Sequence, residues 1–365
     1  MWAGRPTYGS PTPSAASAST DIHSPACSDE VPVLLQPTCS QSGRRPVASG
    51  WSVTAASVPD SRRQKSGRRG VGMSERPEVA VITMARDEGD LLPLWVSHYA
   101  RHVGMDNLVV LDDNSVDGST DDLGCTVHRV PPLKGGLDFE PVRMRLMNGL
   151  AGGLLAVYDY VVFVDVDEFL VTDPAVYPTL PDLLEDRGRP EALGAMGLNV
   201  VHVPSAEPEP LDLGRPLLEQ RRFAKFTPLM CKPSVKRINA GWAVSSHGLK
   251  APYTIDPELF MLHLKFADRD RLAEVARLRN EVSKTDGRAE EASWGKAADE
   301  VLAVFDEVVA DVDAAAVPEF DPAAADLDQM VIFLNGRHRT PKQGQIAALR
   351  KQPLVRIPQR LVGTL

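Results

Sequence analysis

The chain has 365 residues, of which 43% are hydrophobic and 24% are charged, and its formal net charge is −9. These proportions are typical of a globular protein, whereas the acidic balance argues against a nucleic-acid partner, which would need a basic face. No apolar run approaches the roughly 18 residues that predict a membrane-spanning helix. The four cysteines, Cys27, Cys39, Cys125 and Cys231, show no metal-type spacing. We therefore expect a cytoplasmic protein without a transmembrane segment.

Residues 1–72 form a low-complexity segment rich in Ser, Pro, Ala, Thr and Arg, without sustained periodicity. Such a composition cannot bury enough apolar surface to offset chain entropy, so we expect a disordered tail. Met73 stands just before the first convincing strand. Two alternatives stay open: a basic tether for anionic partners, or translation that begins at Met73.

The next stretch predicts strand, helix and strand. Residues 79–84 (VAVITM) predict a buried strand, and Glu88 closes the polar loop that follows it. Apolar residues recur at helical spacing over 91–103, and Gly104 ends this helix. Residues 108–111 (LVVL) predict a second buried strand, which runs into the acidic segment 112–119 (DDNSVDGS).

A third, shorter strand is expected at 127–130 and a helix at 140–151. Residues 160–170 (YVVFVDVDEFL) then place a β-branched, apolar run directly before three carboxylates. Such a run predicts a strand that is buried on both faces. The alternation of strands and helices predicts a parallel sheet with right-handed crossovers.

Acidic side chains follow three strands of this sheet: Glu88 follows the first, Asp112 the second, and Asp165 the strand that begins at residue 160. Parallel topology brings the carboxyl ends of strands to one rim, where ligands of α/β proteins bind. Buried charge is unfavourable unless it is paired or bound to metal. On an extended chain, Asp165 and Asp167 would point the same way. The sequence therefore predicts a cation site at this rim.

These motifs resemble the family 2 nucleotide-sugar glycosyltransferases. Members carry a polar loop ending in Glu after the first strand, matched by residues 84–88 (MARDE), and Asp-Asp-Gly-Ser-x-Asp-Gly-Thr after the second, matched by 112–119 with Asn for Gly. Residues 165–169 (DVDEF) are similar to a subgroup of family 2-like transferases. The resemblance covers residues 78–270. It implies a GT-A-type, Rossmann-like, mostly parallel sheet flanked by helices.

By this resemblance, Glu88 and Asp112 contact the base and ribose of a nucleotide, and Asp113 helps to shape that pocket. Arg86 and Arg143 are candidates for the donor phosphates, because guanidinium groups suit phosphate oxygens. For each arginine, a solvated surface charge is the alternative.

The same resemblance implies a divalent cation, Mn²⁺ or Mg²⁺, held on the donor diphosphate by Asp165 and Asp167, with Asp165 also close to the nucleotide. A late histidine completes the metal shell in many enzymes of this fold. His263 is the candidate and His247 competes with it, although a histidine in an apolar strand is often only a hydrogen-bonded core residue.

The remaining elements complete the expected organisation. We expect a helix at 180–186, a strand at 192–203, a loop at 204–216 and amphipathic helices at 269–282 and 301–312. The expected units are a glycosyltransferase domain at 73–270, a helical extension at 271–335 and a poorly ordered tail at 336–365.

The sequence thus predicts a metal-dependent, hexosyltransferase-like enzyme that moves a sugar from a nucleotide-diphosphate donor to an unknown glycan, lipid or protein acceptor. The catalytic base and the stereochemistry stay open, since Glu207 and Glu209 are available but unconvincing. A non-catalytic nucleotide-sugar or carbohydrate binder is the alternative. An acid-phosphatase-like hydrolase is disfavoured, because its Asp-x-Asp would end the first strand.

Overall fold

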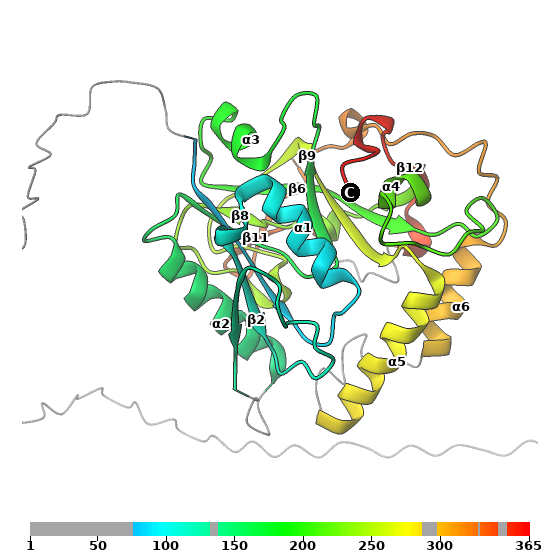
Figure 1. Ribbon diagram of the computed structural model, residues 1–365. Coiled ribbons are helices and arrows are strands. Elements are labelled where there is room, and N and C mark those ends of the chain that lie inside the picture. Colours follow the sequence, from blue (N-terminus) through cyan, green and yellow to red (C-terminus); the bar gives the residue numbers. More distant parts are fainter. Residues whose placement is uncertain (1–75, 132–137, 287–297, 328, 342–348) are drawn as a thin grey trace, which may run out of the picture. The chain divides into compact units, whose positions relative to one another are not determined.

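A computed structural model of the chain describes residues 76–131, 138–286, 298–327, 329–341 and 349–365 (Figure 1). All described residues belong to one compact unit, Gly70–Leu365. The low-complexity segment 1–72 and Met73 lie outside the described residues. Among the described helices, none is long and apolar enough to cross a membrane.

A central sheet is flanked by helices (Figure 1). Its strands and those of a separate hairpin are β1 (Val79–Ala85), β2 (Leu108–Asp112), β3 (Thr126–Arg129), β4 (Tyr160–Phe163), β5 (Glu168–Thr172), β6 (Ala192–Val201), β7 (Phe223–Phe226), β8 (Val235–Lys236), β9 (Thr254–Phe266), β10 (Ile332–Leu334), β11 (Arg337–Arg339) and β12 (Leu354–Arg356). The α-helices are α1 (Leu91–Val103), α2 (Phe139–Leu154), α3 (Leu180–Asp186), α4 (Leu217–Gln220), α5 (Arg269–Asp286) and α6 (Ala298–Val309).

The N-terminal half of the sheet is parallel. Strand β1 pairs in parallel with β2 and β4, and β2 pairs in parallel with β3. Every residue of β1 and β4 is buried, as expected for strands covered on both faces. The predicted α/β class, with a sheet flanked by helices, is therefore confirmed.

The second half of the sheet adds antiparallel pairs. Strand β8 pairs antiparallel with β4 and β6, and β7 pairs antiparallel with β6 and β12. Strand β9 runs parallel to β6 and antiparallel to β5. The two registers align Glu168 of β5 and Asn199 of β6 with the same residue of β9, His263. Three neighbouring strands thus carry polar side chains at one level.

The central strand β4 is shorter than the sequence predicts. It ends at Phe163, residues 166 and 167 form a turn, and β5 begins at Glu168. Asp165 and Asp167 therefore do not lie on an extended strand. The expectation that they point the same way assumed such a strand, and that assumption is wrong. The chain leaves β4 because β5 pairs with β9 rather than with β1.

The C-terminal residues are better ordered than expected. Strand β12 pairs with β7, and Leu361 and Leu365 are buried in the main core. Pro353 and Pro358 lie outside β12, which is an edge strand, so neither removes a ladder hydrogen bond from the sheet interior. The prediction of a poorly ordered tail at 336–365 is corrected for its described part.

Candidate functional site

The loops after β1 and β2 are joined by hydrogen bonds. Asp87, with a φ of 53°, accepts hydrogen bonds from the backbone N–H of Val116 at 2.7 Å and of Asp117 at 3.3 Å. Asp112 accepts one from the Ser115 N–H at 2.7 Å. The parallel topology thus brings the expected loops together, and it buries Asp112 and Asp113 at their base.

Asp165 faces basic side chains. The guanidinium of Arg143 bonds its carboxylate, and the ammonium of Lys232 lies 3.9 Å away. Burial raises the pKa of Asp165, but the charges of Arg143 and Lys232 lower it by more than burial raises it. The net shift of this pKa is therefore downward. Arg143 also donates to Glu140 at 3.2 Å and lies over the Phe163 ring at 5.4 Å. The candidate phosphate ligand Arg143 is therefore already paired within the protein.

Glu168 and Lys232 form a buried ion pair. Their Oε1 and Nζ atoms are 2.7 Å apart, and both side chains are almost fully buried. The other oxygen of Glu168 accepts the Asp165 N–H at 2.9 Å, while Lys232 donates to the Ser246 hydroxyl at 2.9 Å. Burial raises the pKa of Glu168 although Lys232 opposes the shift. Both carboxylate oxygens of Glu168 thus have partners.

A chain of hydrogen bonds fixes the ring of His263. Thr227 donates its hydroxyl proton to the Lys225 carbonyl at 3.1 Å, so its oxygen accepts from the amide nitrogen of Asn199 at 2.9 Å. This orients the Asn199 carbonyl oxygen toward Nδ1 of His263, at 2.6 Å. Because that oxygen only accepts, Nδ1 carries the proton and donates it.

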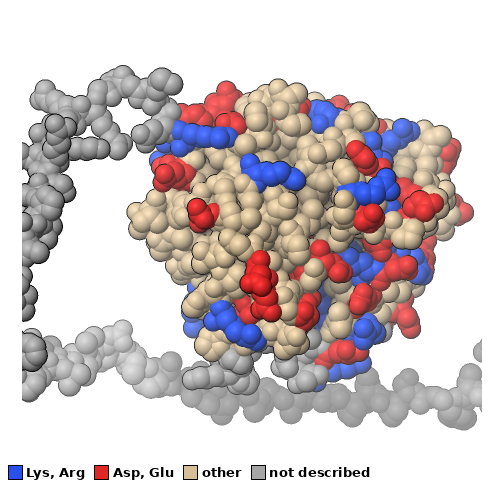
Figure 2. All heavy atoms as spheres, viewed as in Figure 1, with Lys and Arg blue, Asp and Glu red and all other residues tan. Residues whose placement is uncertain are grey.

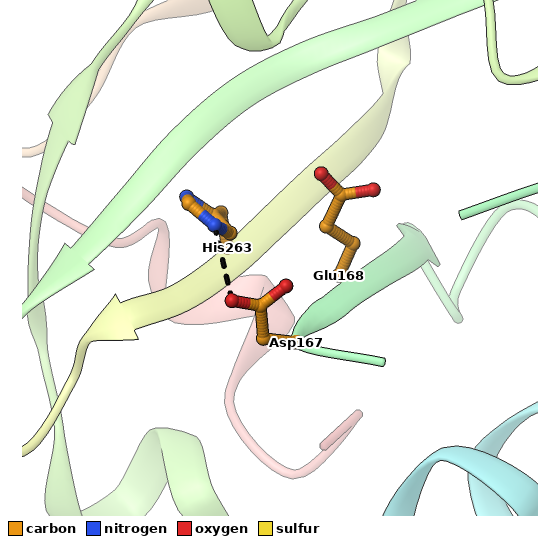
Figure 3. A group of neighbouring side chains, drawn as sticks. All are labelled: Asp167, Glu168 and His263. Carbon is orange, nitrogen blue, oxygen red and sulfur yellow. Dashed lines mark ion pairs between the residues drawn. The ribbon is translucent and has the colours of Figure 1, made fainter. Parts of the chain in front are cut away.

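The second ring nitrogen of His263 faces a carboxylate. Its Nε2 lies 3.4 Å from Oδ2 of Asp167. Figure 3 marks this pair with a dashed line. A neutral ring would present a lone pair to that oxygen, which is favourable only if a second proton or a cation lies between them. Burial raises the pKa of Asp167, but the charge and hydrogen bond of His263 lower it far below its usual range, with Arg279 and Arg271 adding to this.

Asp167, Glu168 and His263 can approach one metal ion. One ligand atom from each of the three residues lies within 4.8 Å of the other two. Among the residues that the structure describes, this is the one group of three such side chains, and Figure 3 shows it. Carboxylate oxygen suits Mn²⁺ and Mg²⁺, whereas imidazole nitrogen is more typical of Zn²⁺, Fe, Cu and Ni. Asn199 supplies the outer partner that metal-binding histidines need. Asp167 and His263 thus fit a divalent cation better than Glu168 does, since Lys232 already neutralises Glu168.

Basic side chains surround Asp167 on its other side. Asp167, Lys265, Arg271 and Arg279 all line a cavity of about 30 Å³ next to α5. Arg271 also bonds Glu88 at 3.3 Å. Burial raises the pKa of Glu88, although Arg279 and Arg271 oppose the shift. Burial lowers the pKa of Lys265 to about 8. Arg271 therefore links Glu88, at the rim of β1, to the cavity beside Asp167.

Sequence reasoning missed the basic residues and Asn199. Arg271 and Arg279 stand eight apart in α5, and this spacing, which places them on one helix face, is a signal that the sequence carries. Asn199 is a buried polar residue within the apolar strand β6. Over the face in Figure 2, acidic and basic side chains are interspersed, so surface charge alone does not mark the site.

The other predicted residues have separate surroundings. Arg86 lies 3.7 Å from Asp87. Glu207 uses both carboxylate oxygens to accept backbone N–H groups, those of Arg222 and Val203. Glu207 and Glu209 line a groove of about 660 Å³ near α4 and β12, and this groove shares no lining residue with the cavity beside Asp167.

No family model matches the sequence, and no curated protein matches it. Some solved structures are similar over part of the chain. One is glucosyl-3-phosphoglycerate synthase from Mycobacterium tuberculosis in complex with Mn²⁺ and uridine-diphosphate-glucose, with 21% identity, a TM-score of 0.24, and coverage of 33% of this chain and 44% of that chain. Another is a cytidylyltransferase from Leptospira borgpetersenii, with 17% identity, a TM-score of 0.23, and coverage of 33% and 54%. The similar region thus spans about a third of this chain and about half of either solved chain.

Proposed function

We propose that the protein is a metal-dependent glycosyltransferase that moves a sugar from a nucleoside-diphosphate donor to an acceptor hydroxyl. The observation that carries this proposal is the Asp167–His263 pair, in which Asn199 leaves the Nε2 lone pair of His263 directed at a carboxylate. A divalent cation between the two groups would take the place of a second ring proton and be coordinated by both. Such a cation supplies charge that neutralises a leaving diphosphate.

The side chains around the pair suit a diphosphate. Lys265, Arg271 and Arg279 line the cavity beside Asp167, and guanidinium groups donate well to phosphate oxygens. In this proposal Arg271 and Arg279 replace Arg86 and Arg143 as the main phosphate contacts, because both line the cavity beside Asp167.

The rim loops supply the nucleotide side of the site. Glu88 reaches the cavity through Arg271, while Asp112 and Asp113 lie at the base of the neighbouring loop. We assign the base and ribose to this rim. Asp165 then supports the site from behind, by holding Arg143 and Lys232, and is not a direct metal ligand.

A metal-dependent binding experiment tests the proposal. Uridine diphosphate and guanosine diphosphate are titrated calorimetrically into the wild-type protein, Asp167→Asn and the exposed control Asp311→Asn, with Mn²⁺ or with chelator. We expect one nucleotide to bind wild type and control only with Mn²⁺, and Asp167→Asn to lose that dependence. Equal binding in chelator, or metal-dependent binding by Asp167→Asn, would contradict the assignment.

The alternative is a carbohydrate or nucleotide-sugar binder without catalysis. It stays open because the carboxylate of Glu207, one of the two acidic residues considered for the base, is fully engaged by backbone donors. Slow hydrolysis of a nucleotide sugar separates the two functions, since a binder releases no nucleoside diphosphate.

A further inference from the structure

The loop between β8 and β9 holds two consecutive residues in a strained conformation. Ser245 has a φ of 57° and Ser246 has a φ of 55°, the left-handed region that non-glycine residues seldom occupy. Such strain concentrates at functional sites. The next residue is His247, which the sequence singles out and the metal pair does not use.

Contacts on both sides hold this loop in place. Lys232 donates to the Ser246 hydroxyl at 2.9 Å, and the Ser245 hydroxyl lies 3.4 Å from Glu140 of α2. Gly248 packs against β11, where an added Cβ would lie 3.1 Å from the His338 carbonyl oxygen. The loop is thus anchored to the same lysine that pairs with Glu168 and lies near Asp165.

The tautomer of His247 follows from its partner. Nδ1 lies 2.9 Å from the carbonyl oxygen of Leu229. A carbonyl only accepts, so Nδ1 carries the proton and Nε2 bears the lone pair. The residue is half-buried. Burial, and then the charge of Lys232, lower the pKa of His247 to about 3, so the ring is neutral at ordinary pH.

We propose that residues 243–249 form a wall of the acceptor subsite and that His247 Nε2 accepts the proton of the acceptor hydroxyl. This inference rests on the proposed function. In the step, Nε2 takes the hydroxyl proton, and the oxygen forms a bond to the anomeric carbon of the sugar. The bond from that carbon to the diphosphate oxygen breaks, and its electron pair leaves with the nucleoside diphosphate.

The neighbouring groups are less suited to this role. Glu168 is paired with Lys232, and Glu140 is paired with Arg143. His263 directs its Nε2 at Asp167. His247 instead has a lone pair on Nε2, and the Leu229 carbonyl fixes its ring. The charges of Lys232 and Asp165 also act on its pKa, in opposite directions.

Two variants of His247 separate catalysis from structure. His247→Asn places an amide near the Nδ1 position, so it can still donate to the Leu229 carbonyl, but it lacks the Nε2 base. His247→Gln places an amide near Nε2 and cannot accept a proton at neutral pH. The exposed residue His128 on β3 gives the control His128→Asn. Melting temperatures report whether each variant folds.

Hydrolysis of a nucleotide sugar, with water as acceptor, supplies the assay. UDP-glucose and GDP-mannose serve as probes with Mn²⁺, and release of UDP or GDP is measured beside calorimetric binding of the same nucleotide. We expect both His247 variants to bind the nucleotide with unchanged affinity and to hydrolyse the donor ~10²–10⁴-fold more slowly, the usual contribution of general-base catalysis. His128→Asn should match wild type.

The outcomes distinguish this inference from the proposed function. If wild type binds neither nucleotide with Mn²⁺, the proposed function fails and the inference fails with it. If wild type binds and hydrolyses but a folded His247→Asn hydrolyses within about threefold of it, below the range of general-base catalysis, the inference alone is overturned. Binding without any hydrolysis by wild type also overturns it, because a base beside the anomeric carbon would activate water.

Discussion

Asn199 decides which nitrogen of His263 carries a proton. Its carbonyl oxygen faces Nδ1 at 2.6 Å, and the Thr227 hydroxyl keeps the amide from turning over. A leucine has nearly the same size but cannot accept a hydrogen bond. The buried ring would then lose its fixed orientation, and Nε2 would no longer be dedicated to Asp167.

We predict that Asn199→Leu weakens Mn²⁺ binding by about 10–100-fold, the usual effect of removing an outer partner of a metal-binding histidine. Isothermal titration with Mn²⁺ checks this. Thr227→Ser keeps the hydroxyl and should bind Mn²⁺ as wild type does. Wild-type affinity in Asn199→Leu would show that Asn199 has only a packing role.

Asp167 makes stability depend on pH in a definite direction. Its pKa in the folded protein is below the ordinary value of about 3.9, chiefly because His263 outweighs the opposing effect of burial. A lowered folded pKa gives stability that is present above the unfolded pKa and is lost as the pH falls toward the folded one. Urea unfolding in chelator should therefore show a larger gap between wild type and Asp167→Asn at pH 5 than at pH 3. A gap that stays constant would contradict this.

At the scale of elements, one turn helps to hold the rings of both His263 and His247. The 3₁₀ turn at Pro228–Met230 follows Thr227, which orients Asn199, and contains Leu229, whose carbonyl holds His247. This turn lies directly against β6 at Gly197. A Cβ on Gly197 would lie 2.5 Å from Cβ of Met230 and 2.8 Å from the Thr227 carbonyl oxygen. Glycine is required there because the two backbones are in contact.

We predict that Gly197→Ala destabilises the protein by about 1–3 kcal/mol, the usual effect of overpacking a core. It should also weaken Mn²⁺ binding and donor hydrolysis together, since the turn moves both imidazoles. Gly153→Ala is the matched control, because nothing lies within 4 Å of its added Cβ and it is in helix α2. Chemical unfolding and the two assays compare them. Loss of stability with Mn²⁺ binding and donor hydrolysis intact would show that the turn does not determine the positions of the two imidazole rings.

The sequence predicts local elements well and pairing between distant segments poorly. Helix α3 matches its predicted bounds, because the Thr179–Asp182 capping box marks its start. Strand β1 is equally clear from its apolar run. The end of β4 is not, because it depends on β5 joining β9, a pairing that no local pattern records. For the same reason Asp167 and His263 could be named as neighbours only through a resemblance, and Asn199 not at all.

At the scale of the whole molecule, the sheet ends at β12. This edge strand pairs with β7, and the C-terminal Leu365 is buried and accepts a hydrogen bond from the Leu218 N–H at 3.3 Å. The C-terminal segment therefore closes the core beside α4. The low-complexity segment 1–72 contributes too little apolar character for such a role.

We predict opposite results from shortening the two ends. A chain that starts at Met73 should melt at the temperature of the full chain. A chain that stops at Gln352 should melt well below it, because burial of Leu361 and Leu365 is lost, and each buried leucine contributes about 1.5–3 kcal/mol. Differential scanning calorimetry on both checks this. A C-terminally shortened chain that melts with the full one would refute the role of β12.

The register of β9 also has a consequence for folding. His263 meets Asn199, 64 residues earlier, only when β9 has paired with β6, and it meets Asp167 only when β9 has paired with β5 as well. Contacts between such distant segments form late, because long loops must close first. A cation that binds this pair therefore cannot guide the early steps of folding. It would instead select chains whose sheet is already complete, and slow their unfolding.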